Sequence, residues 1–153
     1  MNDVMEKETV LEMTRTLAAR PERVFKAWTD PRIMEQWFGP HGMTSAVKEM
    51  DVQPGGTFHA VISGENDHAV RGVYRVIDPP HRLVFSWVWQ QGDLKDRETE
   101  VELTFVPEGD GTLMTLIHRD LPSADSVVSH NGGWGSAIEK LTDQMANCTQ
   151  NQE

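Results

Sequence analysis

The sequence predicts an α+β protein in which a curved antiparallel sheet of six to seven strands wraps around a long C-terminal helix. Residues 132–145 place apolar side chains at helical spacing and polar ones between them. The apolar set is Trp134, Ala137, Ile138, Leu141 and Met145, with Cys148 one turn further on. Most of the chain between Met43 and His118 is instead typical of short strands separated by turns. One apolar helix face and one sheet imply that the two pack together, and we expect a binding site between them.

The remaining elements follow from local signals taken in order. Alternating apolar and polar residues predict a first strand over 8–18. Pro21 suits the first turn of a helix, and a second short helix is expected after Asp30 and Pro31. Six further strands are expected at about 44–52, 57–63, 70–77, 82–90, 98–106 and 112–119. Turn residues at such short spacing favour an antiparallel meander.

Alternation also predicts which side chains of the sheet face inward. The expected inward residues are Leu83, Phe85, Trp87 and Trp89 on one strand, Val101, Leu103 and Phe105 on the next, and Met114, Leu116 and His118 on the last. Glu98, Glu100 and Glu102 lie opposite the second set and are expected to form a solvated face.

Length and charge restrict the class of protein. The 153 residues fit one domain, 1–153, with a core of about 9–148. The net charge of -10 argues against nucleic acid and against an acidic membrane surface, which bind Lys and Arg. No signal peptide and no membrane-spanning run is evident, and Cys148 is the only cysteine, so we expect a cytoplasmic protein. The oligomeric state is left open, with a homodimer as a guess.

A series of short motifs spread over about residues 9–146 resembles the AHSA-like family, relatives of the C-terminal domain of the activator of heat-shock-protein ATPase, in the START-like (SRPBCC) superfamily. No single motif is decisive, but their order and spacing together are specific. They are Thr14-Arg15-Thr16, the run from Pro21 to Pro31, Trp37-Phe38-Gly39-Pro40, Asp51-Val52-Gln53-Pro54-Gly55-Gly56, Gly72-Val73-Tyr74, the run from Asp78 to Phe85, and Gly132-Gly133-Trp134. Gln53 departs from the pattern, since the family usually has arginine there.

The resemblance implies a helix-grip fold (START-like, similar to Bet v 1), in agreement with the pattern above. Members of the superfamily commonly hold a hydrophobic ligand between sheet and helix; some bind lipids, and others act as cyclases or hydrolases. Relatives that activate a chaperone suggest a second role, a protein-interaction module in the stress response. The activators carry a separate N-terminal domain that this chain lacks, so this role ranks second.

The leading hypothesis is therefore binding of a small hydrophobic or amphipathic molecule. The expected ligand-binding residues are Trp37, Phe58, Tyr74, Phe85, Trp87, Trp89, Met114, Trp134, Ile138 and Leu141. From spacing alone the alternative, a filled core, is favoured, because aromatic stripes are usually core. Trp37 has two interpretations of its own: with Phe38 it forms an exposed lid, or it plugs the open end of the sheet.

No particular reaction is indicated. The chain lacks nucleotide-binding glycine motifs and a nucleophile elbow, and its six histidines show no metal-ligand spacing, so neither cofactor nor metal is expected. His118 is the one weak candidate for a general base, against the favoured alternative of a hydrogen-bonded histidine at a strand end. A cyclase or hydrolase ranks third.

Overall fold

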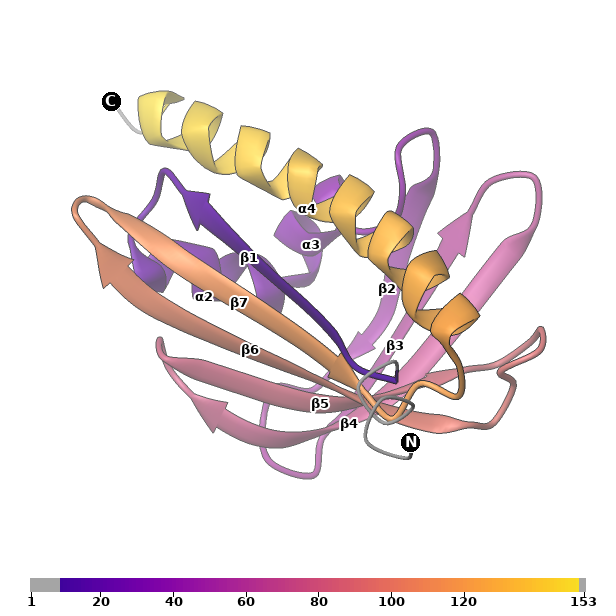
Figure 1. The fold of residues 1–153 in the computed structure, drawn as a ribbon. Helices are drawn as coiled ribbons and strands as arrows, with labels where there is room; N and C mark the ends of the chain where they lie inside the picture. Colours follow the sequence, from indigo (N-terminus) through magenta and orange to yellow (C-terminus); the bar gives the residue numbers. More distant parts are fainter. Residues whose placement is uncertain (1–8, 152–153) are drawn as a thin grey trace.

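The computed structural model describes residues 9–151, with side chains up to Asn147. Seven antiparallel strands form one sheet in the order β1-β7-β6-β5-β4-β3-β2. The strands are β1 (Leu11–Leu17), β2 (Thr44–Met50), β3 (Thr57–Ser63), β4 (Asp67–Asp78), β5 (Arg82–Trp89), β6 (Glu98–Glu108) and β7 (Gly111–Arg119). The helices are α2 (Pro21–Thr29), α3 (Pro31–Trp37) and α4 (Ala124–Asn151). The predicted α+β helix-grip architecture is confirmed: α4 crosses the concave face of the curved sheet (Figure 1).

The predicted facing of the strands is also confirmed. In the register between β6 and β7, Leu103 lies opposite Leu116 and Val101 opposite His118. All four of these side chains are fully buried. The choice of Met114, Leu116 and His118 as the inward set of β7 therefore holds.

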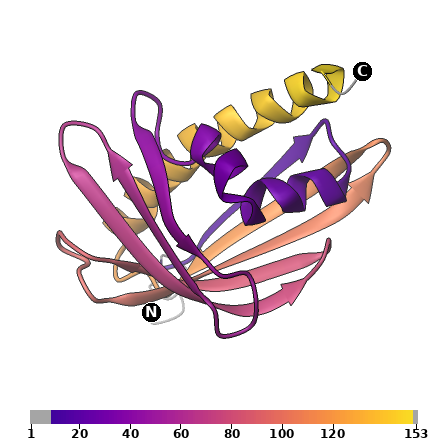
Figure 2. The same ribbon diagram turned by 180° about the vertical axis from the view of Figure 1, so that it is seen from behind.

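The two short helices fill the space between the edges of the curved sheet, beside α4 (Figure 2). Asp30 accepts a hydrogen bond from the backbone N–H of Arg32 and so caps α3, which follows α2 directly. Trp37 ends α3 and donates its indole N–H to the carbonyl of Ala27 at 3.2 Å. Both Trp37 and Phe38 are buried, so the expectation of an exposed Trp-Phe lid is wrong, and their burial agrees with the alternative of a plug.

Helix α4 begins eight residues earlier than the pattern predicts, at Ala124 instead of Gly132. Ser123 accepts a hydrogen bond from the N–H of Ser126, which is a helix-capping contact. Glycine has a low helix propensity, so the glycines at 132, 133 and 135 argued against a helix that begins further upstream. The first turns of α4 were therefore not predicted. A Cβ at any of the three would meet no atom within 4 Å, so packing does not require glycine there.

The Pro-Gly-Gly turn between β2 and β3 does require its glycines. Gly55 has φ of +86°. A Cβ on Gly56 would lie 2.0 Å from the carbonyl oxygen of Asp51, which no side chain tolerates. Gln53, where the family usually has arginine, donates its side-chain N–H to Asp51 at 3.0 Å.

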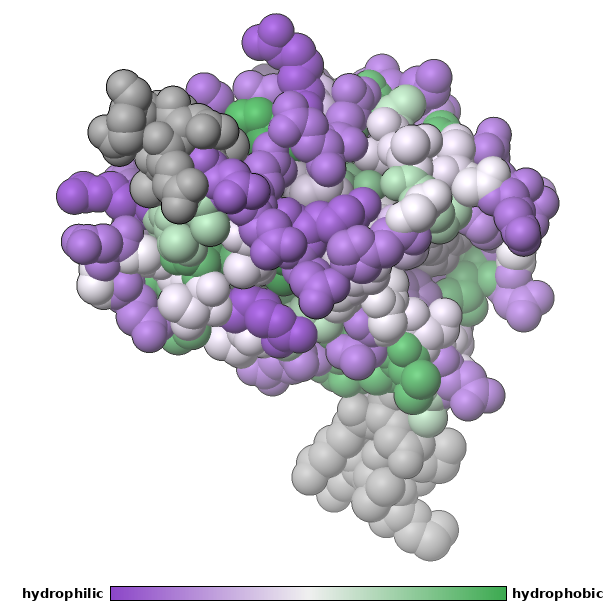
Figure 3. All heavy atoms as spheres, turned by 90° about the horizontal axis from the view of Figure 1, so that it is seen from above, coloured by the Kyte–Doolittle hydropathy of each residue, from purple (hydrophilic) through white to green (hydrophobic). Residues whose placement is uncertain are grey.

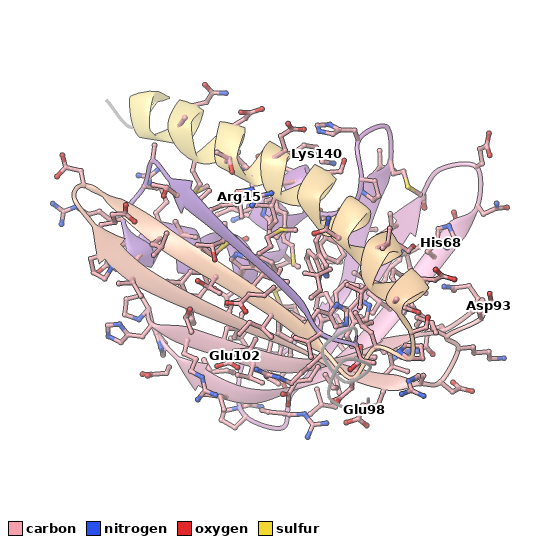
Figure 4. The ribbon with its side chains drawn as sticks, in the orientation of Figure 1. Arg15, His68, Asp93, Glu98, Glu102 and Lys140 are labelled. Atoms are coloured by element: carbon pink, nitrogen blue, oxygen red, sulfur yellow. The ribbon has the colours of Figure 1, made fainter. Side chains whose placement is uncertain are left out.

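The acidic ladder of β6 lies on the outer face of the sheet, away from α4, where Figure 4 labels Glu98 and Glu102. It is more than a solvated face, because each glutamate pairs with an arginine of another strand. Glu102 is 15% exposed and pairs with Arg82 at 2.7 Å and with Arg119 at 3.0 Å. Glu98 pairs with Arg75, and Glu100 with Arg75 and Arg119.

Candidate binding cavity

A cavity of about 540 Å³ opens where α4 begins, between that helix and the neighbouring ends of β3, β4 and β5. Its size is typical of sites for small organic ligands. The lining comes from α4, the segment after α3, these three strands, and the loop between β5 and β6. The lining residues are Phe38, Gly39, Pro40, Met43, Ile62, His68, Trp87, Trp89, Gln91, Asp93, Leu94, Asp125, Ser126, Ser129, His130, Gly133, Trp134 and Ala137.

Three tryptophans form the aromatic wall of the cavity. The ring centroids of Trp87 and Trp89 are 5.3 Å apart, and those of Trp87 and Trp134 are 5.0 Å apart. Phe38 packs edge-on against Trp87 at 5.9 Å. Edge-to-face contacts of this kind stabilise an aromatic cluster beyond simple burial.

The segment after α3 that forms another wall is tied to α4. The backbone N–H of His41 donates to the hydroxyl of Ser136 at 2.6 Å, and the His41 ring contacts the Glu139 carboxylate at 2.7 Å. Lys140 donates to the carbonyl of Pro40 at 3.3 Å. These contacts fix the position of a segment that has no regular secondary structure.

Behind the wall, His118 is held by a chain of directional hydrogen bonds. The indole of Trp134 can only donate, so Nδ1 of His118 accepts its N–H, at 3.1 Å. The proton of the neutral ring then lies on Nε2, which donates to the Thr99 hydroxyl at 2.8 Å. Thr99 in turn donates to the carbonyl of Trp87 at 2.8 Å. The chain assigns the tautomer and uses both ring nitrogens.

Burial also keeps the His118 ring uncharged. Loss of hydration, with a smaller contribution from nearby His130, lowers the pKa of His118 to about 3. The side chain is fully buried. Its geometry therefore matches the hydrogen-bonded alternative, and neither nitrogen is free to remove a proton from a ligand.

His130 repeats this arrangement at the cavity surface. Its Nδ1 donates to the carbonyl of Ser126 at 2.8 Å, and its Nε2 accepts the indole N–H of Trp89 at 3.1 Å. Burial lowers the pKa of His130, although the Ser126 contact acts in the opposite direction. Sequence reasoning missed His130; the signal available was its spacing, four residues before Trp134 on one helix face.

Trp87 differs from the other two tryptophans of the wall. Within the described residues its buried indole N–H has no hydrogen-bond partner, whereas those of Trp89 and Trp134 bind histidines. An unpartnered buried donor costs about 1–3 kcal/mol. Trp87 is thus the one wall tryptophan with a donor still unsatisfied.

Of the ten residues predicted to bind ligand, the structure places Trp87, Trp89 and Trp134 at the cavity. The other seven lie in the packed core and do not line it: Trp37, Phe58, Tyr74, Phe85, Met114, Ile138 and Leu141. Tyr74 is among them, and burial followed by the charge of Asp51 raises the pKa of its phenol.

Several polar residues of the cavity lining were not anticipated from the sequence. They are His68, Gln91, Asp93, Asp125, Ser126 and Ser129. Figure 4 shows His68 and Asp93 together at the end of the sheet where α4 begins. Among residues 9–147 no three His, Cys, Asp or Glu side chains come together as metal ligands.

Comparison with known families shows which family the chain belongs to. Residues 18–146 match the family described as Activator of Hsp90 ATPase homolog 1-like protein. The chain belongs to this family. No curated protein matches the sequence.

Solved structures share the AHSA1-like fold over most of the chain. The AHSA1 protein of Silicibacter pomeroyi is 27% identical with a TM-score of 0.78, covering 90% of this chain and 97% of its own. A protein of Chromobacterium violaceum is 23% identical with a TM-score of 0.81, over 90% and 97% of the two chains. CalU16 of Micromonospora echinospora is 27% identical with a TM-score of 0.68, over 93% and 79%. None of the helices in the described part of this AHSA1-like chain is long and apolar enough to cross a membrane.

Proposed function

We propose that this protein binds a small, mainly apolar molecule in the cavity beside the start of α4. The observation that carries the proposal is the combination of a 540 Å³ cavity, a tryptophan wall and several polar residues in the lining. Binding sites for small molecules combine an apolar lining with a few placed polar groups in this way.

The wall is preorganised, which favours a binding site over a gap left by incomplete packing. Trp89 and Trp134 are each held by a hydrogen bond from the indole to a histidine whose other nitrogen is also engaged. Side chains already fixed in place lose little entropy when a ligand binds.

The test is a pair of neighbouring substitutions on α4. Ser129 lines the cavity, whereas Val128 does not line it and is 71% exposed. Ser129→Phe should fill the cavity and weaken binding of N-phenyl-1-naphthylamine, an uncharged fluorescent probe, at least about tenfold, or ~1.4 kcal/mol. Val128→Phe, the matched control, should bind as the parent protein does. Equal binding by both variants would show that the probe does not occupy this cavity.

A second candidate, docking to a chaperone, is favoured by the family to which the chain belongs. The surface gives it less support: the large exposed hydrophobic residues among those described are four valines from separate segments, Val10, Val73, Val106 and Val128. Figure 3 shows the face that carries α4 as mostly hydrophilic. Stimulation of a chaperone ATPase that survives Ser129→Phe would identify this role as separate from the cavity.

A further inference from the structure

The side chains of fixed charge that line the cavity are both carboxylates. Asp93 and Asp125 line it, while neither Lys nor Arg is among the lining residues. His130 is kept neutral because burial lowers its pKa. Lys140 lies nearby but donates to the carbonyl of Pro40, and it is not part of the lining.

Only one of the two carboxylates, Asp125, has a structural role in the fold. Asp125 stands in the first turn of α4, where a negative charge interacts favourably with the helix dipole. Asp93 lies in the loop between β5 and β6, and within the described residues it forms neither an ion pair nor a side-chain hydrogen bond. Asp93 therefore has no structural role that would explain a carboxylate at this position.

The aromatic wall favours the same ligand charge as the carboxylates do. The faces of indole rings attract cations, more strongly where water is excluded. Trp87 and Trp89 meet almost at right angles, with 86° between their planes, so the two rings of the wall are oriented differently. The net charge of -10 adds a long-range attraction for cations.

Resting on the proposed function, we infer that the ligand carries a positively charged nitrogen, as an amine or quaternary ammonium group, on an apolar body. The apolar body lies against the tryptophans, and the cation lies toward Asp93 and Asp125. A fatty acid or a phosphorylated ligand would instead place an anion beside two carboxylates with no cation in the lining to offset it.

The experiment compares three ligands with one apolar body: decylamine, decanol and decanoate, each displacing N-phenyl-1-naphthylamine. At low ionic strength decylamine should bind about three- to tenfold more tightly than decanol, and decanoate should bind weakest. Asp93→Asn should reduce the advantage of decylamine about two- to fivefold and leave decanol unchanged. Asp110→Asn removes the same charge in the β6–β7 turn, away from the cavity lining, and should change none of the three.

The outcomes separate this inference from the function on which it rests. Equal binding of decylamine and decanol, tightest binding of decanoate, or equal effects of Asp93→Asn and Asp110→Asn would overturn the cationic ligand while the cavity still binds the uncharged probe. Failure of the parent protein to bind the probe itself would overturn the proposed function instead.

Discussion

The indole N–H of Trp134 on α4 donates to Nδ1 of His118 on β7, at 3.1 Å, and this bond joins the long helix to the sheet. Both partners are buried, and the bond fixes one wall of the cavity while it assigns the tautomer of the histidine. The Trp134 side chain thus both joins the helix to the sheet and forms part of the cavity wall.

Trp134→Phe tests that bond. The substitution keeps most of the ring but leaves Nδ1 of buried His118 without its donor, so the free energy of unfolding should fall by about 1–3 kcal/mol more than in a control. Trp28→Phe is the control, because Trp28 is equally buried and its indole N–H has no partner among the described residues. Urea unfolding measures both. Equal losses would show that the bond contributes nothing.

Stability should depend on pH through His118. Its pKa is lowered from 6.5 to about 3 in the folded protein, so the unfolded chain binds the proton more readily between these values. The stabilisation is present above pH 6.5 and is lost as pH falls. From pH 7 to pH 5 the free energy of unfolding should drop by about 2 kcal/mol from this group alone. His118→Gln should show a smaller drop over the same interval; an unchanged pH dependence would contradict a neutral buried His118.

On the outer face, Glu102 should matter more than Glu98. Burial raises the pKa of Glu102, but hydrogen bonds from Arg82 and Arg119 outweigh it and lower the pKa overall. Glu102→Gln should cost about 1–3 kcal/mol at pH 7. The cost should decrease as the pH falls below the unfolded pKa and disappear below the lowered folded pKa, since the stabilisation is complete only above the unfolded pKa. Glu98→Gln, at a 62% exposed site with one partner, should cost little. Similar losses of stability in Glu102→Gln and Glu98→Gln would mean that burial of the Glu102 ion pairs is unimportant.

Glycine 132 should be replaceable, and Gly56 should not. Gly132→Ala places a methyl group in open space within α4 and should raise the free energy of unfolding by about 0.5–1 kcal/mol. Gly56→Ala should instead destabilise strongly, because its Cβ would lie 2.0 Å from the Asp51 carbonyl oxygen. Thermal unfolding of the two variants distinguishes these cases. A loss of stability in Gly132→Ala would show that the helix needs the glycine.

Alternation predicted which face of the sheet each side chain points to, but not whether it lines the cavity or packs in the core. Phe85 and Trp87 share one face of β5, yet only Trp87 reaches the cavity, while Phe85 packs against Phe58 and Tyr74. The difference depends on how α4 crosses the sheet and on where Phe38 packs against Phe58 and Trp87, neither of which a local pattern encodes. The early start of α4 was not predicted because the three glycines lower the helix propensity of that segment. The carboxylate of Asp93 lies in a loop, where no periodicity marks its side chain.

Native mass spectrometry of gently purified protein tests most directly whether the cavity holds a small molecule. We predict an additional mass on the parent protein and on Val128→Phe that is released by denaturation and is absent from Ser129→Phe. The same bare mass for all three proteins would contradict the proposed function.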